Sequence, residues 1–161
     1  MFSSPSAPPA LQSGFTALHT AEPDFGYAST VQWAIDADNS IATLANTSGY
    51  TWAVLVYRGQ TGIGHSAVRD LEDVGTEATY PTLTMEASDG TSTVLAIVIA
   101  NQQRTISTPT GMTPVLQHDG SFGAGSFDVF EQAGATAFSG ATSTWSGGAY
   151  WVTYSIEILG A

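Results

Sequence analysis

The sequence of 161 residues contains no cysteine and no lysine, and three arginines are its only strongly basic side chains. Without cysteine the chain cannot form disulfides, thiolate nucleophiles or cysteine-based zinc sites. Fourteen acidic residues give a net charge of -11, and such a surface repels phosphate backbones and anionic membranes. We therefore expect neither nucleic acid nor a membrane as a partner.

Long apolar runs are missing as well. No stretch of about 18 apolar residues could span a bilayer, and the first residues lack the basic and apolar regions of a secretory signal. Only 11% of the residues are charged and 43% are hydrophobic, a balance typical of short strands joined by small-residue turns. We expect an all-β protein in which residues 15–161 form a single domain without a transmembrane segment.

Two stretches of the sequence resemble each other. Residues 47–59 and 146–160 each pass from a Ser/Gly turn to a tryptophan, Trp52 or Trp151, and then to an apolar run that ends near a glycine. Aromatic and β-branched residues in such runs indicate strands. We interpret the two stretches as copies of one strand in a two-layer β architecture, with Trp52 and Trp151 in the core.

Other strands are predicted from alternation and from composition. Val31, Trp33 and Ile35 recur at a spacing of two, and residues 94–100 are the most apolar run, which predicts a strand buried on both faces. Residues 60–79 have no clear period, so we predict a long connection between sheets there. These features favour a jelly-roll-like antiparallel β-sandwich.

The second half of the chain continues this pattern. Residues 80–87 are predicted to form a strand with Tyr80, Leu83 and Met85 facing inward, and Asp89-Gly90 is a tight-turn signal. Further strands are expected over residues 112–118, 127–131 and 137–144.

Residues 1–14 are rich in proline and serine and have no periodicity. Pro5, Pro8 and Pro9 favour an extended course without backbone donors. Two interpretations stay open: a loose leader, or an interface arm that lies on a neighbouring subunit with Phe2 and Leu11 as apolar anchors.

Catalytic and metal-binding patterns are weak. The close acid pairs, Asp36 with Asp38 and Glu72 with Asp73, lie in predicted turns, and the first only resembles the start of a calcium loop without its later ligands. His19, His65 and His118 have no metal-ligand spacing, and no nucleophile elbow or phosphate loop is present. We expect no catalytic residue, no cofactor and no metal site, and hence no enzyme.

Trp145 is the one aromatic residue that we consider as a ligand platform. It lies beside a Ser/Gly turn, where an exposed ring could stack on a sugar. The alternative is a core position, which large aromatic side chains on strands usually occupy.

Three segments carry a family resemblance: Trp52 to Gly59, Asp89 to Val98 and Pro109 to Thr113. Together they resemble β-sandwich structural proteins of tailed bacteriophages. The resemblance implies a non-enzymatic virion protein, most specifically a capsid decoration (cement) protein that stabilises the head, assembles as a homotrimer and binds the major capsid protein or another virion protein. The alternative it leaves open is a tail-fibre module that binds a receptor or carbohydrate. No functional residue follows from it.

Overall fold

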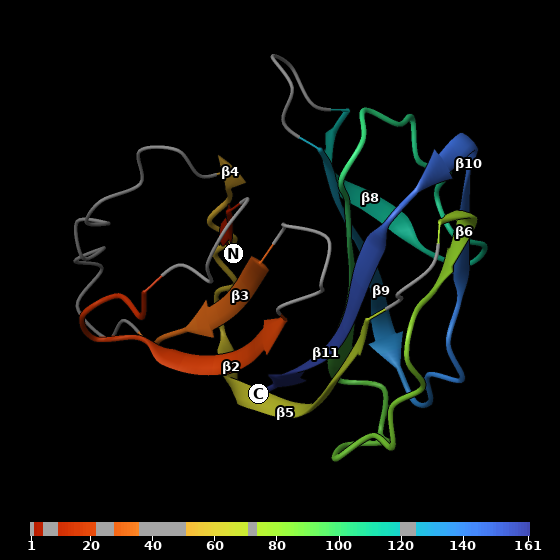
Figure 1. Ribbon diagram of the computed structural model, residues 1–161. Coiled ribbons are helices and arrows are strands. Elements are labelled where there is room, and N and C mark those ends of the chain that lie inside the picture. The colour runs from red at the N-terminus through yellow and green to blue at the C-terminus, as the bar shows by residue number, and fades with distance from the viewer. Residues whose placement is uncertain (1, 5–9, 22–27, 36–50, 71–73, 120–124) are drawn as a thin grey trace. The chain divides into compact units, whose positions relative to one another are not determined.

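The computed structural model describes residues 2–4, 10–21, 28–35, 51–70, 74–119 and 125–161. The described part of the chain is all-β, with antiparallel sheets and no helix, which confirms the predicted class (Figure 1). Its strands are β1 (Phe2–Ser4), β2 (Thr16–Ala21), β3 (Ala28–Trp33), β4 (Thr51–Trp52), β5 (Gln60–Asp70), β6 (Gly75–Thr79), β7 (Ser92–Ala100), β8 (Thr113–His118), β9 (Ser126–Ala135), β10 (Thr142–Ala149) and β11 (Trp151–Gly160).

The chain divides into two compact units. The first comprises Met1–Val56 and the second Tyr57–Ala161. The predicted boundary after residue 14, between an extended arm and a β-sandwich domain, stays a prediction.

The first unit contains a four-stranded sheet in the order β2-β3-β1-β4. Strand β3 pairs antiparallel with β2 and β1, and Val31 is buried as its alternation predicted. The strand ends at Trp33, so Ile35 lies beyond it and is 69% exposed.

The second unit is built on a five-stranded antiparallel sheet in the order β5-β11-β7-β9-β8. Strand β7 lies in the middle, and all nine of its residues are buried. This confirms the prediction of a strand buried on both faces. Strand β11 lies beside it and pairs with β7 on one edge and β5 on the other, so a long run of backbone donors and acceptors is satisfied within the sheet.

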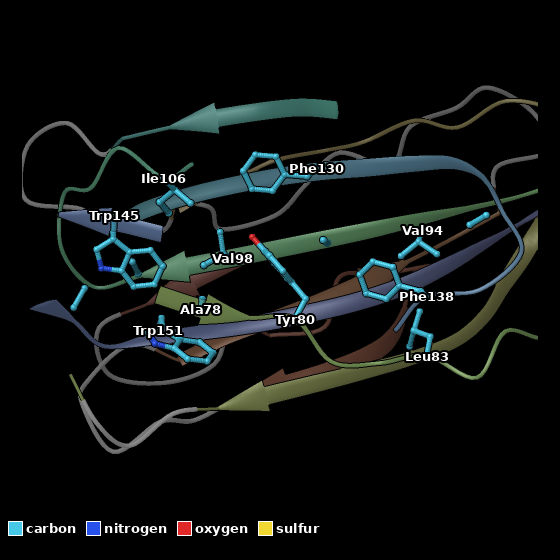
Figure 2. Close-up of a cluster of buried hydrophobic side chains, with 14 residues drawn as sticks. Ala78, Tyr80, Leu83, Val94, Val98, Ile106, Phe130, Phe138, Trp145 and Trp151 are labelled. Atoms are coloured by element: carbon cyan, nitrogen blue, oxygen red, sulfur yellow. The ribbon is translucent and has the colours of Figure 1, made fainter. Parts of the chain in front are cut away.

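A second, two-stranded sheet in this unit pairs β10 with β6. Side chains from both sheets form one apolar cluster, with Ala78 and Trp145 from the small sheet against Val98, Phe130 and Trp151 from the large one. Figure 2 shows the two tryptophans at one end of the cluster and Phe138 and Leu83 at the other. Trp151 is therefore a core residue, as predicted, whereas the side chain of Trp52 lies outside the described residues.

Two predictions about residues 47–79 are wrong. Strand pairing stops after Trp52, so the apolar residues from there to Gly59 belong to no sheet. Val54 and Val56 are 44% and 61% exposed. The expected long connection instead contains β5 and β6. The pairing edge of β11 decides where the strand forms, because β-propensity is realised only against a neighbouring strand. The two Trp stretches are thus not copies of one strand.

The remaining predictions are mostly close. Tyr80 and Leu83 are buried and Met85 packs against the core, but residues 80–87 form an irregular segment with one bridge, Leu83 to Phe138. Gly90 has a φ of 85°, and Asp89 accepts hydrogen bonds from Thr91, so the turn is confirmed. Strands β8 and β9 lie where strands were expected, whereas β10 begins later than predicted.

Among the described residues, no helix is long and apolar enough to cross a membrane.

Candidate functional site

The chemically most developed arrangement surrounds Glu157, which lies near the end of β11. Glu157 is opposite Val94 of β7 in the sheet register and is completely buried. Residues opposite one another in antiparallel strands point to the same face, so its carboxylate lies on the face that carries the apolar cluster. A charged group in this position needs internal partners.

Four donors supply these partners. Oε2 accepts from the backbone N–H of His65 (3.2 Å) and of Glu86 (2.7 Å), and Oε1 accepts from the N–H of Ala87 (3.0 Å) and the hydroxyl of Ser92 (3.0 Å). We call Glu157 with these four donors the Glu157 site. A carboxylate has about four lone-pair positions, so each of its oxygens is fully engaged.

These contacts set the charge state of Glu157. Burial pushes its pKa up, but the hydrogen bonds from Glu86, Ala87, His65 and Ser92 outweigh burial, so the pKa lies below its ordinary value. The carboxylate is therefore ionised at neutral pH. A saturated, ionised carboxylate has no free position from which to accept a substrate proton, so it holds backbone in place.

Gly64 of β5 leaves the space that Glu157 occupies. A Cβ atom at this position would lie 2.5 Å from Oε2 and 2.8 Å from the carboxyl carbon. His65 adds a further tie, because its Nδ1 contacts the carbonyl oxygen of Thr84. The glycine in β5 is thus required by the close approach of Glu157.

Two more polar residues of β11 act in the same way. The hydroxyl of Thr153 donates to the carbonyl of Thr79 at 3.0 Å, and that of Ser155 donates to the carbonyl of Pro81 at 2.7 Å. With Glu157 they alternate along the strand and point to one face. Together the three side chains bind the backbone of residues 79–87, which runs along β11 on this face of the sheet.

A second buried polar group lies across the core. The hydroxyls of Tyr80 and Ser143 are 3.0 Å apart, and Ser143 donates to the carbonyl of Ser107. Burial, with the charge of Asp128 nearby, raises the pKa of Tyr80, although the contact with Ser143 lowers it. Tyr80 therefore stays neutral, and it serves as a structural hydrogen-bonding group.

Among the described residues of this unit, Asp128 is the other buried carboxylate. Burial raises its pKa, while the N–H of His118 at 2.9 Å and the side chain of Gln117 oppose the rise. Asp128 accepts fewer hydrogen bonds than Glu157, so burial determines the direction. The two buried carboxylates thus have pKa values shifted in opposite directions.

Two arginines of the second unit are engaged in internal contacts. The guanidinium of Arg69 lies 5.9 Å from the centroid of the Trp151 ring, and Arg104 donates to the carbonyls of Gln103 (2.8 Å) and Gly148 (2.7 Å). No described residue accepts from Nε of Arg104 or Nε1 of Trp151, although both atoms are buried. These contacts lie at the tryptophan end of the cluster.

Of the residues predicted as possible sites, Trp145 is described in full. Trp145 is 7% exposed, and its Nε1 donates to the carbonyl of Gly75 at 3.1 Å, so its ring packs in the core and offers no open face. Its sequence signal, a Ser/Gly turn, does not distinguish a core ring from a platform.

The predicted arm is described only in part. Phe2 belongs to β1, where it pairs with β3 and β4, and Leu11 is 55% exposed. Pro5, Pro8 and Pro9 lie outside the described residues, as do the acid pairs at 36/38 and 72/73. Within the described ranges no group of three or more His, Cys, Asp or Glu side chains could hold a metal ion.

Little in the sequence indicates the Glu157 site. Its donors come from residues 65, 86, 87 and 92, and three of the four are backbone N–H groups, which every residue type except proline supplies. The available signal is a charged residue inside an apolar strand. Such a residue has to be paired if the strand is buried on both faces.

Comparisons with protein-family models, with curated proteins and with solved structures found no match to this chain. The residues and their geometry are therefore the structural basis for proposing a function.

Proposed function

We propose that this protein is a non-enzymatic structural component of a tailed-bacteriophage virion, most specifically a capsid decoration (cement) protein that stabilises the head. One observation carries the most weight: Glu157 and Tyr80, two buried ionisable groups of the second unit, are engaged in internal hydrogen bonds. Glu157 is saturated by four donors, and Tyr80 stays neutral in the core. Enzymes instead keep such groups in a cleft with free positions toward a substrate.

The all-β architecture also supports this role. The two sheets of the second unit share one core, which is compatible with the jelly-roll-like sandwich that the resemblance implies. In this proposal the protein assembles as a homotrimer on the capsid, where several weak contacts with the major capsid protein act together.

The surface charge is consistent with a protein partner. Arg58, Arg69 and Arg104 are the only strongly basic side chains beside fourteen acidic residues, so the net charge of -11 is carried by a surface with few cations. Such a surface suits a basic protein surface better than a phosphate backbone. Binding to heads should then weaken as salt concentration rises.

Electron microscopy of phage particles that carry the labelled protein tests the proposal. Labelling spread evenly over the head is expected, and particles without the protein should release their DNA at a lower temperature. Labelling confined to the tail tip would support the alternative, a tail-fibre or receptor-binding module, and would contradict decoration. Absence from particles would contradict both virion roles. The burial of Trp145 removes the residue that best supported carbohydrate binding.

A further inference from the structure

The segment of residues 53–59 joins the two units along the chain and belongs to no strand. It follows β4 and precedes β5, and the division between the units falls inside it, between Val56 and Tyr57. Boundaries between compact units are the parts of a chain that few contacts hold, and exposed connections of this kind are where proteases cut. The segment 53–59 is therefore a candidate for cleavage in the folded protein.

Burial alternates along this segment, as it does in an extended chain with one side covered. Residues 53, 55 and 57 are half-buried, whereas Val54, Val56 and Arg58 are exposed. Gly59 is exposed as well, and a Cβ atom at this position would have nothing within 4 Å. The peptide bond from Arg58 to Gly59 thus lies at the exposed end of the segment, directly before β5.

The backbone at this bond suits a protease. A segment outside the sheets can enter an active site without breaking a ladder of hydrogen bonds, so its opening needs little free energy. Gly59 has a φ of 71°, and glycine moves from there to the extended conformation without a steric penalty. The guanidinium of Arg58 supplies specificity, because it pairs with a carboxylate in the pocket of a trypsin-like protease.

The other two arginines are placed differently. The chain has no lysine, so Arg58, Arg69 and Arg104 are the positions after which a protease specific for basic residues can cut. Arg69 lies within β5 opposite Thr153 of β11, and its guanidinium lies 5.9 Å from the centroid of the Trp151 ring. A cut after Arg69 therefore requires β5 to leave the sheet.

Arg104 lies in an irregular segment, but both its backbone and its side chain are held. Its N–H donates to Oγ of Ser126 at 2.6 Å, and its carbonyl accepts from the same hydroxyl at 2.8 Å. Its guanidinium donates to the carbonyls of Gln103 and Gly148. Ile106, two residues further on, is buried in the core. A protease would have to break these contacts before it could bind Arg104.

We propose that the Arg58–Gly59 bond is the cleavage site of the folded protein for a trypsin-like protease, and that the cut leaves the second unit folded. The C–N bond breaks as water adds across it, with the hydroxyl group going to the carbonyl carbon of Arg58 and the hydrogen to the nitrogen of Gly59. The proposal concerns this chain alone and does not depend on the virion role.

The described contacts of the second unit explain why it survives the cut. Strands β5 to β11 and their pairings all lie after Gly59, so fragment 59–161 keeps both sheets and the apolar cluster. The hydroxyl of Tyr57 donates to Glu131 of β9 at 3.0 Å, and this bond joins residues on opposite sides of the cut. It lies outside the apolar cluster, so its loss leaves the core intact.

Limited digestion of the native full-length protein with trypsin tests the proposal. Intact-mass spectrometry at early times should show fragments 1–58 and 59–161 at least about tenfold more abundant than products cut after Arg69 or Arg104. Digestion in urea gives the reference rates of the three sites in the unfolded chain. Fragment 59–161 should then persist and keep the circular dichroism of a β-sheet protein.

Arg58→Gln and Arg69→Gln form the matched pair of variants, because both remove one positive charge at an exposed residue. Arg58→Gln should slow the loss of the native chain at least about tenfold, whereas Arg69→Gln should change it by less than about twofold. First cuts after Arg69 or Arg104 in the native protein, or an unchanged rate for Arg58→Gln, would overturn the proposal. Degradation of fragment 59–161 as fast as it forms would also overturn it.

Discussion

Residues 51–59 and 151–160 begin alike, each with a tryptophan close to apolar residues, but only the second stretch is a full strand. Trp151–Gly160 pairs on both edges as β11, whereas strand pairing at Thr51–Trp52 ends after two residues. The stretch that stays outside the sheets is the more uniformly apolar one, and its Val56 is 61% exposed. Apolar content alone therefore does not determine which stretch becomes a central strand.

The difference lies in the polar residues of β11. Thr153, Ser155 and Glu157 alternate along the strand, and each binds the backbone of the segment of residues 79–87. No such alternation occurs after Trp52, where Ala53 to Tyr57 are all apolar or aromatic. Specific polar contacts thus fix the position of β11, and the predictions below test them.

Replacement of Glu157 by Gln should have the largest effect. The amide keeps the shape of the side chain, but its NH₂ group faces N–H donors, so at least one pair of donors loses its acceptor. We expect the free energy of unfolding to fall by roughly 2–4 kcal/mol, measured by urea denaturation.

Glu86→Gln is the matched control for this substitution. It makes the same change of charge at an exposed side chain whose backbone N–H alone contacts Glu157. Its effect should stay within about 0.5 kcal/mol. Equal losses for the two variants would show that charge, and not the Glu157 site, accounts for the effect.

Gly64→Ala should destabilise the protein next most strongly. The added methyl group would lie 2.5 Å from Oε2 of Glu157, a side chain held by four hydrogen bonds that resist its movement. Overpacking of this kind costs about 1–3 kcal/mol. Gly62→Ala on the same strand is the comparison, since nothing lies within 4 Å of its Cβ position. A loss in thermal stability no larger for Gly64→Ala than for Gly62→Ala would contradict the close approach.

Acid should reduce the contribution of Glu157 to the stability of the folded state. Burial pushes the pKa of Glu157 up, but its hydrogen bonds hold it below the ordinary value of 4.5. Because the pKa is lower in the folded state, the stabilisation is present above pH 4.5 and is lost as pH falls through the folded pKa. The stability gap between the wild type and Glu157→Gln should therefore narrow as pH falls in a series of urea titrations.

Asp128 provides the opposite case in the same titrations. Burial raises its pKa, so its contribution is greatest below the ordinary value of 3.8 and is lost as pH rises through the folded pKa. The stability of the wild type relative to Asp128→Asn should fall as pH rises. If the stability differences between the wild type and Glu157→Gln and between the wild type and Asp128→Asn changed in the same direction with pH, the environments of the two carboxylates would not differ as described.

Val56→Ala should have the smallest effect. Val56 belongs to no strand and its side chain is 61% exposed, so truncation removes little buried surface. The free energy of unfolding should change by less than about 0.5 kcal/mol. Val98→Ala, at a fully buried position of β7, should cost roughly 2–3 kcal/mol. Comparable thermal shifts for these two variants would remove the contrast between the two stretches.

The sequence predicted the parts of the fold that depend on local composition. Residues 94–100 are apolar on both faces and form β7, and Asp89-Gly90 forms a turn because glycine adopts the positive φ that the turn requires. These features need no knowledge of distant residues.

The parts that were missed depend on contacts between distant residues. Strand β5 contains glycines and a histidine and lacks an apolar period, yet it forms because β11 offers a pairing edge and because Gly64 makes room for Glu157. The Glu157 site was equally hidden, since three of its four donors are backbone groups, one of them 92 residues away in the sequence. Trp145 was considered for a surface role because it lies beside a Ser/Gly turn, whereas its partner, the carbonyl of Gly75, is 70 residues away in the sequence.

Amide hydrogen exchange tests most directly whether Glu157 holds the backbone of Glu86 and Ala87 in place. The N–H groups of Glu86 and Ala87 donate to its carboxylate, so they should exchange slowly in the wild type although they lie outside a regular strand. In Glu157→Gln their protection should fall at least tenfold, while the amides of β7 stay protected. Unchanged exchange at Glu86 and Ala87 in this variant would contradict the account.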